Sequence, residues 1–234
     1  MPQKMPMTTR RTKTNLPAPA QGLYHPAQEH DACGIGFVAH VRGHKSHDIV
    51  SKGIQVLLNL AHRGACGCDP ETGDGAGILL QIPHQFFVRK CVQLGFELPV
   101  PGAYGVGMTF LPVEKHQRLQ CEGVLERIAR EEGLTVLGWR DTPVKAAAIG
   151  RVARGSQPYI QQIFVGCGAF TDEDVFERKL YVMRKRAESE IAASGIEDAE
   201  TFHILLSLAA PLFTKVCCSP RRSPISTKSF PIPT

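Results

Sequence analysis

The stretch Cys33-Gly34-Ile35-Gly36-Phe37-Val38-Ala39-His40 determines which chemistry is open to this chain. A polar segment with several prolines precedes the stretch, and an apolar segment that ends in His62-Arg63-Gly64-Ala65 follows it. A cysteine that is the first residue of a mature chain carries both a thiol and an α-amine. The amine can take the proton of the thiol, so no separate histidine base is needed. Cleavage between Ala32 and Cys33 would create such a residue, and without cleavage most of this chemistry is unavailable.

The composition is that of one globular domain with two basic ends. The chain has 234 residues, 43% of them hydrophobic, and a formal net charge of +5. Neither 1–28 nor 211–234 contains an acidic residue, whereas the middle is close to neutral. A nucleic-acid surface would spread its positive charge over a folded face, so we expect unstructured ends and no nucleic-acid partner. No stretch approaches the roughly 20 apolar residues of a membrane span.

The leader, residues 1–32, and the cysteines both indicate a cytoplasmic protein. The leader lacks the apolar stretch of a secretory signal. Its arginines and threonines faintly suggest an organelle transit peptide, but Pro17, Pro19 and Pro26 would break an amphipathic helix. The eight cysteines should stay reduced in a chain without an export signal. Cys66 and Cys68 stand too close together for the usual zinc knuckle, so we expect no metal site.

Hydrophobic periodicity predicts strands and helices that interleave without a regular β-α-β period. The expected strands are 33–41, 78–82, 103–111, 135–139, 159–165 and 202–208, and the expected helices are 47–61, 84–94, 112–132 and 171–193. The loop 64–77 contains five glycines and should pass close to another group. This order favours a layered sheet protein over a doubly wound one.

Two motifs allow more than one interpretation. Gly34-Ile35-Gly36-Phe37-Val38-Ala39 fits the dinucleotide-binding fingerprint, but that fingerprint requires a helix directly after it, and here a strand is expected. A dinucleotide-binding oxidoreductase is therefore disfavoured. Arg63 could hold a carboxylate in a two-pronged grip, or it could be a positive charge at the end of a helix. Residue types alone leave these two roles of Arg63 equally open.

Several long blocks resemble, in order, the start of the large (α) subunit of glutamate synthases. The resemblance covers about residues 22–210. The matching blocks are Gly22-Leu23-Tyr24, Glu29 to Ala39, Leu60 to Ala65, Asp69, Thr72 to Leu79, Gln157 to Gly166 and Phe176 to Arg186.

This resemblance implies a class II (type 2) glutamine amidotransferase domain with the fold of the N-terminal nucleophile (Ntn) hydrolases. That fold is α+β, with four αββα layers in which two antiparallel sheets stack between helices. It further implies that 1–32 is a propeptide and that 33–210 is the amidotransferase domain. Cys33 would then attack the side-chain amide of L-glutamine, Arg63 would contact that substrate, and Asp74 and Gly75 would belong to a loop near the site.

The resemblance also implies partners outside this chain. In the full-length enzyme, ammonia would pass to a synthase domain that converts 2-oxoglutarate to glutamate with FMN and an iron–sulfur cluster, alongside a small (β) subunit. We expect neither cofactor, no metal and no membrane contact in these residues.

The chain also departs from the family pattern. An arginine-bearing segment like Arg-Phe-Ser-Thr-Asn-Thr and the Asn-Gly pair that stabilises the oxyanion are absent from this sequence. We therefore expect an incomplete fold at the C-terminus, a disordered basic tail over 211–234 that derives from a shifted reading frame, and little activity of this chain alone. The alternative is a non-catalytic module that binds glutamine or a partner subunit.

Overall fold

A computed structural model of the chain describes residues 34–60, 72–73, 75–170, 172–207 and 212–216. Only the backbone is described for 205–207 and 212–216. The chain divides between Cys33 and Gly34, and all described residues belong to the unit that begins at Gly34. The expectations for the leader 1–32, for Arg63 and for most of the loop 64–77 lie outside the described residues.

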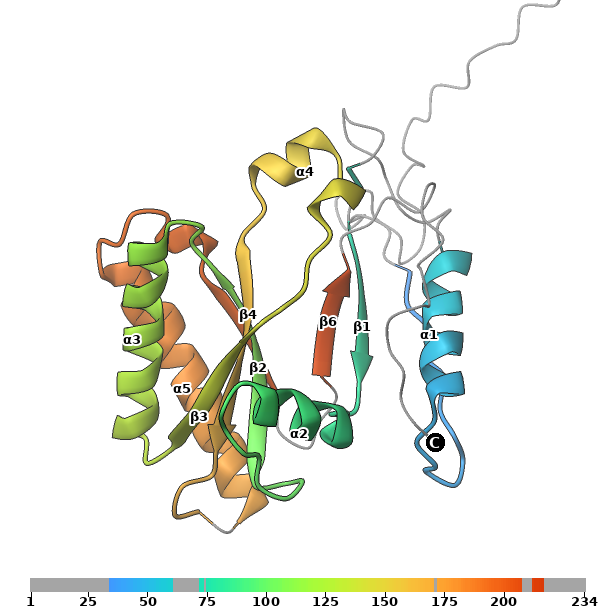
Figure 1. Cartoon of the computed structure of the whole chain (residues 1–234), viewed down its shortest axis with the longest axis horizontal. Coiled ribbons are helices and arrows are strands. Elements are labelled where there is room, and N and C mark those ends of the chain that lie inside the picture. The colour runs from blue at the N-terminus through green and yellow to red at the C-terminus, as the bar shows by residue number, and fades with distance from the viewer. Residues whose placement is uncertain (1–33, 61–71, 74, 171, 208–211, 217–234) are drawn as a thin grey trace, which may run out of the picture. The chain divides into compact units, whose positions relative to one another are not determined.

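Four antiparallel strands form the main sheet (Figure 1). They are β2 (Tyr104–Leu111), β3 (Thr135–Asp141), β4 (Tyr159–Gly166) and β5 (His203–Ser207). Their order is β3-β4-β2-β5, so β2 and β4 lie in the centre. Both central strands are largely buried, as expected for strands covered from two sides, although β4 carries Gln161 and Gln162.

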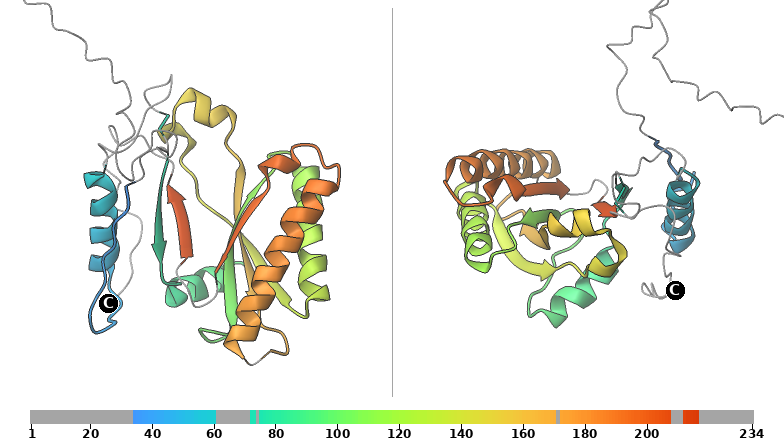
Figure 2. Two further views of the ribbon diagram at one scale, coloured as in Figure 1. Left: turned by 180° about the vertical axis from the view of Figure 1, so that it is seen from behind. Right: turned by 90° about the horizontal axis from the view of Figure 1, so that it is seen from above.

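Helices α3 (Lys115–Glu131) and α5 (Glu173–Ala193) cover one face of this sheet (Figure 2). Each places apolar residues three or four positions apart, so that one stripe is buried. The buried residues of the two helices are Gln117, Cys121, Leu125, Ile128 and Ala129 in α3 and Phe176, Leu180, Met183, Ala187 and Ile191 in α5. Asp172 begins α5 because its side chain accepts a hydrogen bond from the backbone N–H of Val175 at 3.0 Å.

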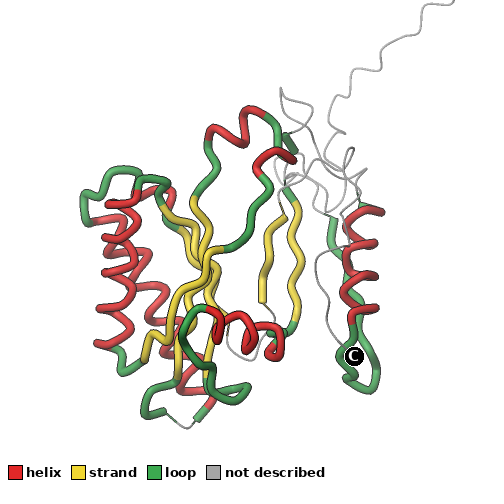
Figure 3. The backbone as a smooth tube through the Cα atoms, in the orientation of Figure 1, coloured by secondary structure: helices red, strands yellow, loops and turns green. Residues whose placement is uncertain are grey.

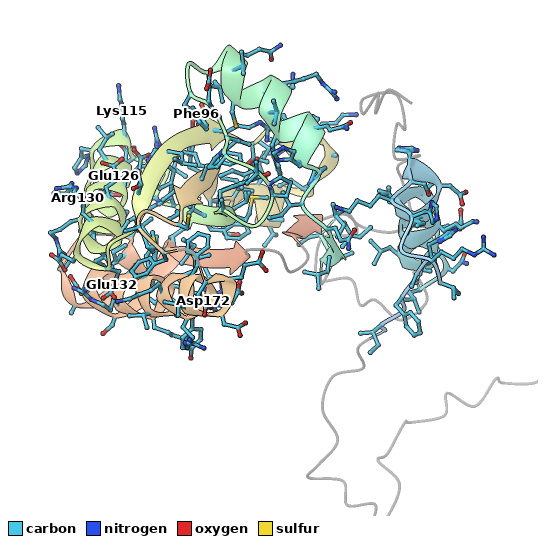
Figure 4. The ribbon with its side chains drawn as sticks, turned by 90° about the horizontal axis from the view of Figure 1, so that it is seen from below. Phe96, Lys115, Glu126, Arg130, Glu132 and Asp172 are labelled. Atoms are coloured by element: carbon cyan, nitrogen blue, oxygen red, sulfur yellow. The ribbon has the colours of Figure 1, made fainter. Side chains whose placement is uncertain are left out.

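Helix α2 (His84–Gln93) packs on the opposite face, at the end where β2 begins. Phe87 meets Phe164 edge to face, with ring centroids 5.1 Å apart, and Cys91 completes the contact. A hydrogen bond of 2.9 Å between His84 Nδ1 and the Tyr104 hydroxyl ties the helix to β2. Figure 4 shows Phe96 on this side of the sheet and Glu132 on the side of α3 and α5.

A second, smaller strand pair joins β1 (Ala76–Leu80) to β6 (Leu212–Val216) in antiparallel register. Helix α1 (His47–Asn59) packs against β1, where a Cβ on Gly53 would lie 3.0 Å from Ile78 Cδ1. None of the residues of α1 is fully buried, although its apolar stripe is half-buried. The remaining elements are the 3-10 turns η3 (Ala146–Ala148) and η4 (Ala199–Thr201) and the short helix α4 (Arg151–Gly155).

The antiparallel pairing and the separate helices confirm the α+β class. The four predicted helices and the strands near 78–82, 103–111, 135–139, 159–165 and 202–208 are present, with ends that differ by a few residues. The strand near 78–82 begins earlier, at Ala76, and is half-buried rather than buried.

Two sequence-based predictions are wrong. The strand predicted over 33–41 is absent from Gly34 to His40, which have no regular structure. Ile35 and Phe37 are 89% and 92% exposed, because no described strand pairs with this segment to bury its alternating apolar side chains. The disorder predicted from 211 fails for Leu212–Val216, which form β6. This segment is rich in residues that favour strands, and the edge of β1 supplies its hydrogen bonds.

The contact between α3 and β3 contains an unfavourable carboxylate. Burial raises the pKa of Glu122 above its ordinary value, and the nearby carboxylates of Glu126 and Asp141 raise it further, while Arg118 and a hydrogen bond from the Gln161 side chain act in the opposite sense. A carboxyl group whose pKa is raised in the folded state destabilises the fold when it is ionised. This destabilisation is present at neutral pH, where the Glu122 carboxyl is ionised. It decreases as the pH falls through the pKa that Glu122 has in the folded protein.

Glu122→Gln should therefore raise the free energy of unfolding at pH 7 by on the order of 1 kcal/mol. Gln161 Oε1 is buried without a hydrogen-bond partner among the described residues, and the new amide could donate to it. Urea unfolding at pH 7 and pH 4 measures the effect, which should shrink at the lower pH. An equal or larger gain at pH 4 would contradict the explanation.

Candidate functional site

The predicted nucleophile Cys33 lies directly before the first described residue, and the described segment that follows it rests on α1. A Cβ on Gly36 would lie 2.5 Å from Val56 Cγ1, so only glycine fits this approach to the helix. In the sequence, Gly36 stands out as part of the motif that fits the dinucleotide-binding fingerprint. The structure gives it a different requirement, which is close packing on the last turns of α1.

Arg63 also lies outside the described residues, but the helix that leads to it is well defined. Ser46 caps the start of α1, where its hydroxyl accepts a hydrogen bond of 3.4 Å from the Ile49 N–H. The helix ends at Asn59, and the N–H of Leu60 donates to the Val56 carbonyl at 3.0 Å. This end is earlier than the sequence predicted, and it is Leu60 rather than Arg63 that occupies the C-cap position.

The segment that contains the predicted site residues Asp74 and Gly75 leads into β1. Asp74 lies outside the described residues, whereas Gly75 has a φ of +83°, a left-handed conformation that favours glycine. Helix α1 ends on the side where β1 begins, as the colours in Figure 1 show. The described chain therefore breaks off after α1 and resumes before β1 at the same end of the α1–β1 pair.

Thr72 begins the block Thr72 to Leu79, one of those that resemble the family. Its hydroxyl accepts a hydrogen bond of 3.4 Å from the backbone N–H of Ala153 in α4, 81 positions along the chain. The bond connects the segment before β1 to the long connection between β3 and β4. No periodicity or spacing signals such a contact, because it joins two irregular segments that only the tertiary fold brings together.

The described cysteines are poor alternatives to Cys33 as a nucleophile. Burial raises the pKa of Cys91 and of Cys121 to about 11, so both thiols remain protonated at neutral pH. Cys167 is half-buried and forms no disulfide. A thiolate, not a thiol, is the reactive form.

The described residues also bear on other classes of site. Among them, no group of three or more His, Cys, Asp or Glu side chains is arranged to hold a metal ion. Gly36 is followed by irregular backbone, and α1 begins only at His47, so the helix that a dinucleotide fingerprint requires is absent. No helix in the described part of the chain is both long and apolar enough to cross a membrane.

Comparison with known proteins identifies the family that these features fit. The model of the class II glutamine amidotransferases matches residues 33–217. The large chain of NADPH-dependent glutamate synthase from Bacillus subtilis is 46% identical over 179 residues, which are 76% of this chain and 12% of that protein. Ferredoxin-dependent glutamate synthase 2 from Synechocystis is 37% identical over 82% of this chain and 12% of its own length. NADH-dependent glutamate synthase from Saccharomyces cerevisiae is 40% identical over 76% of this chain and 9% of its own length.

Proposed function

This chain belongs to the class II glutamine amidotransferases, and we propose that it carries the glutaminase site of a glutamate synthase, with Cys33 as the nucleophile. The observation that carries the proposal is that the family match begins at Cys33 itself and runs to residue 217. The chain spans only about an eighth of the length of the relatives it matches. The activity of the whole enzyme is therefore part of the proposal.

The proposed reaction needs two functions from one residue. The α-amine of Cys33 accepts the thiol proton, and the sulfur attacks the side-chain carbonyl carbon of L-glutamine. The tetrahedral intermediate collapses as the C–N bond of the side-chain amide breaks. The protonated α-amine of Cys33 gives its proton to the leaving nitrogen, which departs as ammonia. Water then attacks the glutamyl thioester, which releases glutamate and restores the thiol. An ordinary α-amine titrates near pH 8 and a free thiol near 8.5, so the proton transfer is nearly balanced.

Arg63 would hold the α-carboxylate of the glutamine substrate. A guanidinium group binds a carboxylate through two parallel hydrogen bonds, which fixes orientation as well as position. The described neighbours support this role, because Gly36, which follows Cys33 closely in the chain, packs on Val56 in the last turn of α1, the helix that precedes Arg63 in the sequence. Leu60 makes the cap of the helix, so a C-cap role for Arg63 is less favoured.

The remaining chemistry would take place in other parts of a longer enzyme. Ammonia would pass to a synthase domain that uses FMN and an iron–sulfur cluster to convert 2-oxoglutarate to glutamate, and a small subunit would assist. The described residues here do not fit an iron–sulfur cluster, since they contain no suitable group of ligands.

The layered arrangement of the Ntn hydrolases is part of the same proposal. In it, the β1–β6 pair belongs to a second antiparallel sheet that stacks on the four-stranded sheet, and 33–210 forms most of the amidotransferase domain after a propeptide of 1–32. The support is that the small pair is antiparallel and that α1 covers β1 on one side. A cytoplasmic location fits the same enzyme class.

The maturation of the chain provides the direct test. The full 234-residue chain is expressed in cells competent for maturation, and its intact mass and amino-terminal sequence are measured. We expect removal of 1–32 and an amino-terminal Cys33. Purified protein that still begins at Met1 would overturn the mechanism, because Cys33 would then lack its free amine. A mature chain that binds glutamine without any covalent reaction at Cys33 would instead favour the non-catalytic module.

A further inference from the structure

A row of three side chains crosses the four-stranded sheet on the face that carries α2. Arg140 in β3 lies directly opposite Gln162 in β4, and Gln162 lies directly opposite Met108 in β2. Residues that are directly opposite in antiparallel strands project to the same face of the sheet. Helix α2 lies across one end of these strands (Figure 3), and the ring centroid of its Phe86 is 5.5 Å from Arg140 Cζ. A cation therefore stands at the margin of a buried apolar layer.

The hydrogen bonds of Arg140 and Gln162 leave most of their N–H groups without an acceptor among the described residues. Arg140 Nη1 donates to Gln162 Oε1 at 2.6 Å, and the described structure gives neither side chain a second hydrogen bond. A guanidinium group carries five N–H donors, and a glutamine amide nitrogen carries two. Gln162 is only 4% exposed, so solvent has little access to its amide. The pair thus offers donors from two side chains in a largely buried place.

The charge of Arg140 is not neutralised by any described carboxylate. Arg127 and Arg186 each form ion pairs with glutamates of α3 and α5, whereas no ion pair of the described residues includes Arg140. Hydrogen bonds to glutamates accordingly raise the pKa of Arg127 and of Arg186, but burial lowers the pKa of Arg140. A partly buried cation is costly unless an anion lies beside it. The local chemistry therefore favours an anionic ligand.

We propose that Arg140 and Gln162 form a binding site for a small organic carboxylate. A guanidinium fork donates two parallel hydrogen bonds to the two oxygens of a carboxylate, and the amide nitrogen of Gln162 is a further donor beside it. The ring of Phe86 supplies an apolar contact for the carbon chain of the ligand, which favours an aliphatic carboxylate over chloride. The inference goes beyond the proposed function and does not depend on it, since it uses neither Cys33 nor Arg63.

The experiment adds sodium butyrate to the isotope-labelled full chain and follows the side-chain amide signal of Gln162 by nuclear magnetic resonance. Butyramide, the neutral counterpart of butyrate, and sodium chloride at equal ionic strength are the control ligands. Arg140→Lys keeps the positive charge but loses the fork of donors. Arg89→Lys is the matched control, because Arg89 is an exposed arginine on the neighbouring helix α2. The backbone amide spectrum checks that each variant is folded.

We expect the Gln162 signal to shift with a saturable dependence on butyrate and a dissociation constant on the order of 1–10 mM, as suits a ligand of this size. Arg140→Lys should weaken binding about 10-fold, whereas Arg89→Lys should leave it unchanged. Shifts that do not saturate, that butyramide or chloride reproduces, or that persist with equal affinity in Arg140→Lys would overturn the site. If Arg140→Lys does not fold, the comparison of butyrate with butyramide in the unmodified chain decides the question.

Discussion

Replacing Cys33 with alanine should abolish the covalent reaction of the mature chain with a diazoketone analogue of glutamine, a loss of about 10⁴-fold or more. Among the described cysteines, Cys91 and Cys121 are not expected to replace it, because burial raises the pKa of both thiols to about 11. Mass spectrometry of the Cys33 peptide and of the intact chain measures the loss. This readout requires only binding and nucleophilic attack, so it does not depend on complete turnover.

Cys167→Ala is the control for this prediction. Cys167 is half-buried and free of disulfides, and its backbone N–H bonds to the Ala103 carbonyl at 3.0 Å, a contact that alanine keeps. The variant should react with the analogue at the rate of the unmodified chain. Analogue incorporation that persists in Cys33→Ala, or that disappears in Cys167→Ala, would show that Cys33 is not the nucleophile.

Gly168→Ala should lower the free energy of unfolding by about 3 kcal/mol. Gly168 follows β4 with a φ of +60°, a conformation that costs a residue with a Cβ about 1–2 kcal/mol. A Cβ there would also lie 2.2 Å from the carbonyl oxygen of Gly133, at the turn after α3. Because the clash is with backbone, a side-chain rotation cannot relieve it, and the two turns must separate.

Gly195→Ala separates the cost of the left-handed conformation from the cost of the clash with the backbone of Gly133. Gly195 has a similar φ of +70°, but nothing lies within 4 Å of the place where a Cβ would be. This variant should therefore lose only the conformational cost of about 1–2 kcal/mol. Urea unfolding of both variants measures the difference. Equal losses would mean that the two turns after α3 and β4 do not pack as closely as described.

The elements that the sequence predicted well are those in which a single period governs burial. In α5 the residues Phe176, Leu180, Met183, Ala187 and Ile191 recur at three- and four-residue spacing, and all five are buried. In β2 and β4 the apolar runs are short and lie between turns, which is typical of central strands. Such local patterns predict the element correctly because the same face of it must be buried, whichever part of the protein it packs against.

The predictions that failed depended on a partner far along the chain. Gly34 to His40 alternate as a strand would, yet the described structure gives them no neighbouring strand, and Gly36 packs on Val56 instead. Leu212–Val216 form a strand only because β1 provides an edge with the matching register. Strand pairing is non-local, so neither outcome could be read from a window of sequence.

The amino-acid sequence by itself determined the class of the fold and the family, since residue types and their order carry that information, and it predicts Cys33 and, through the family resemblance, Arg63 as site residues. The tertiary structure decided that Gly36 must be glycine, that α1 ends before Arg63 and that Thr72 meets Ala153. Each of these depends on a distance between segments that are not adjacent in the sequence. The pattern of apolar residues specifies which face of an element must be buried, whereas only the packing of the elements specifies which atoms come into contact.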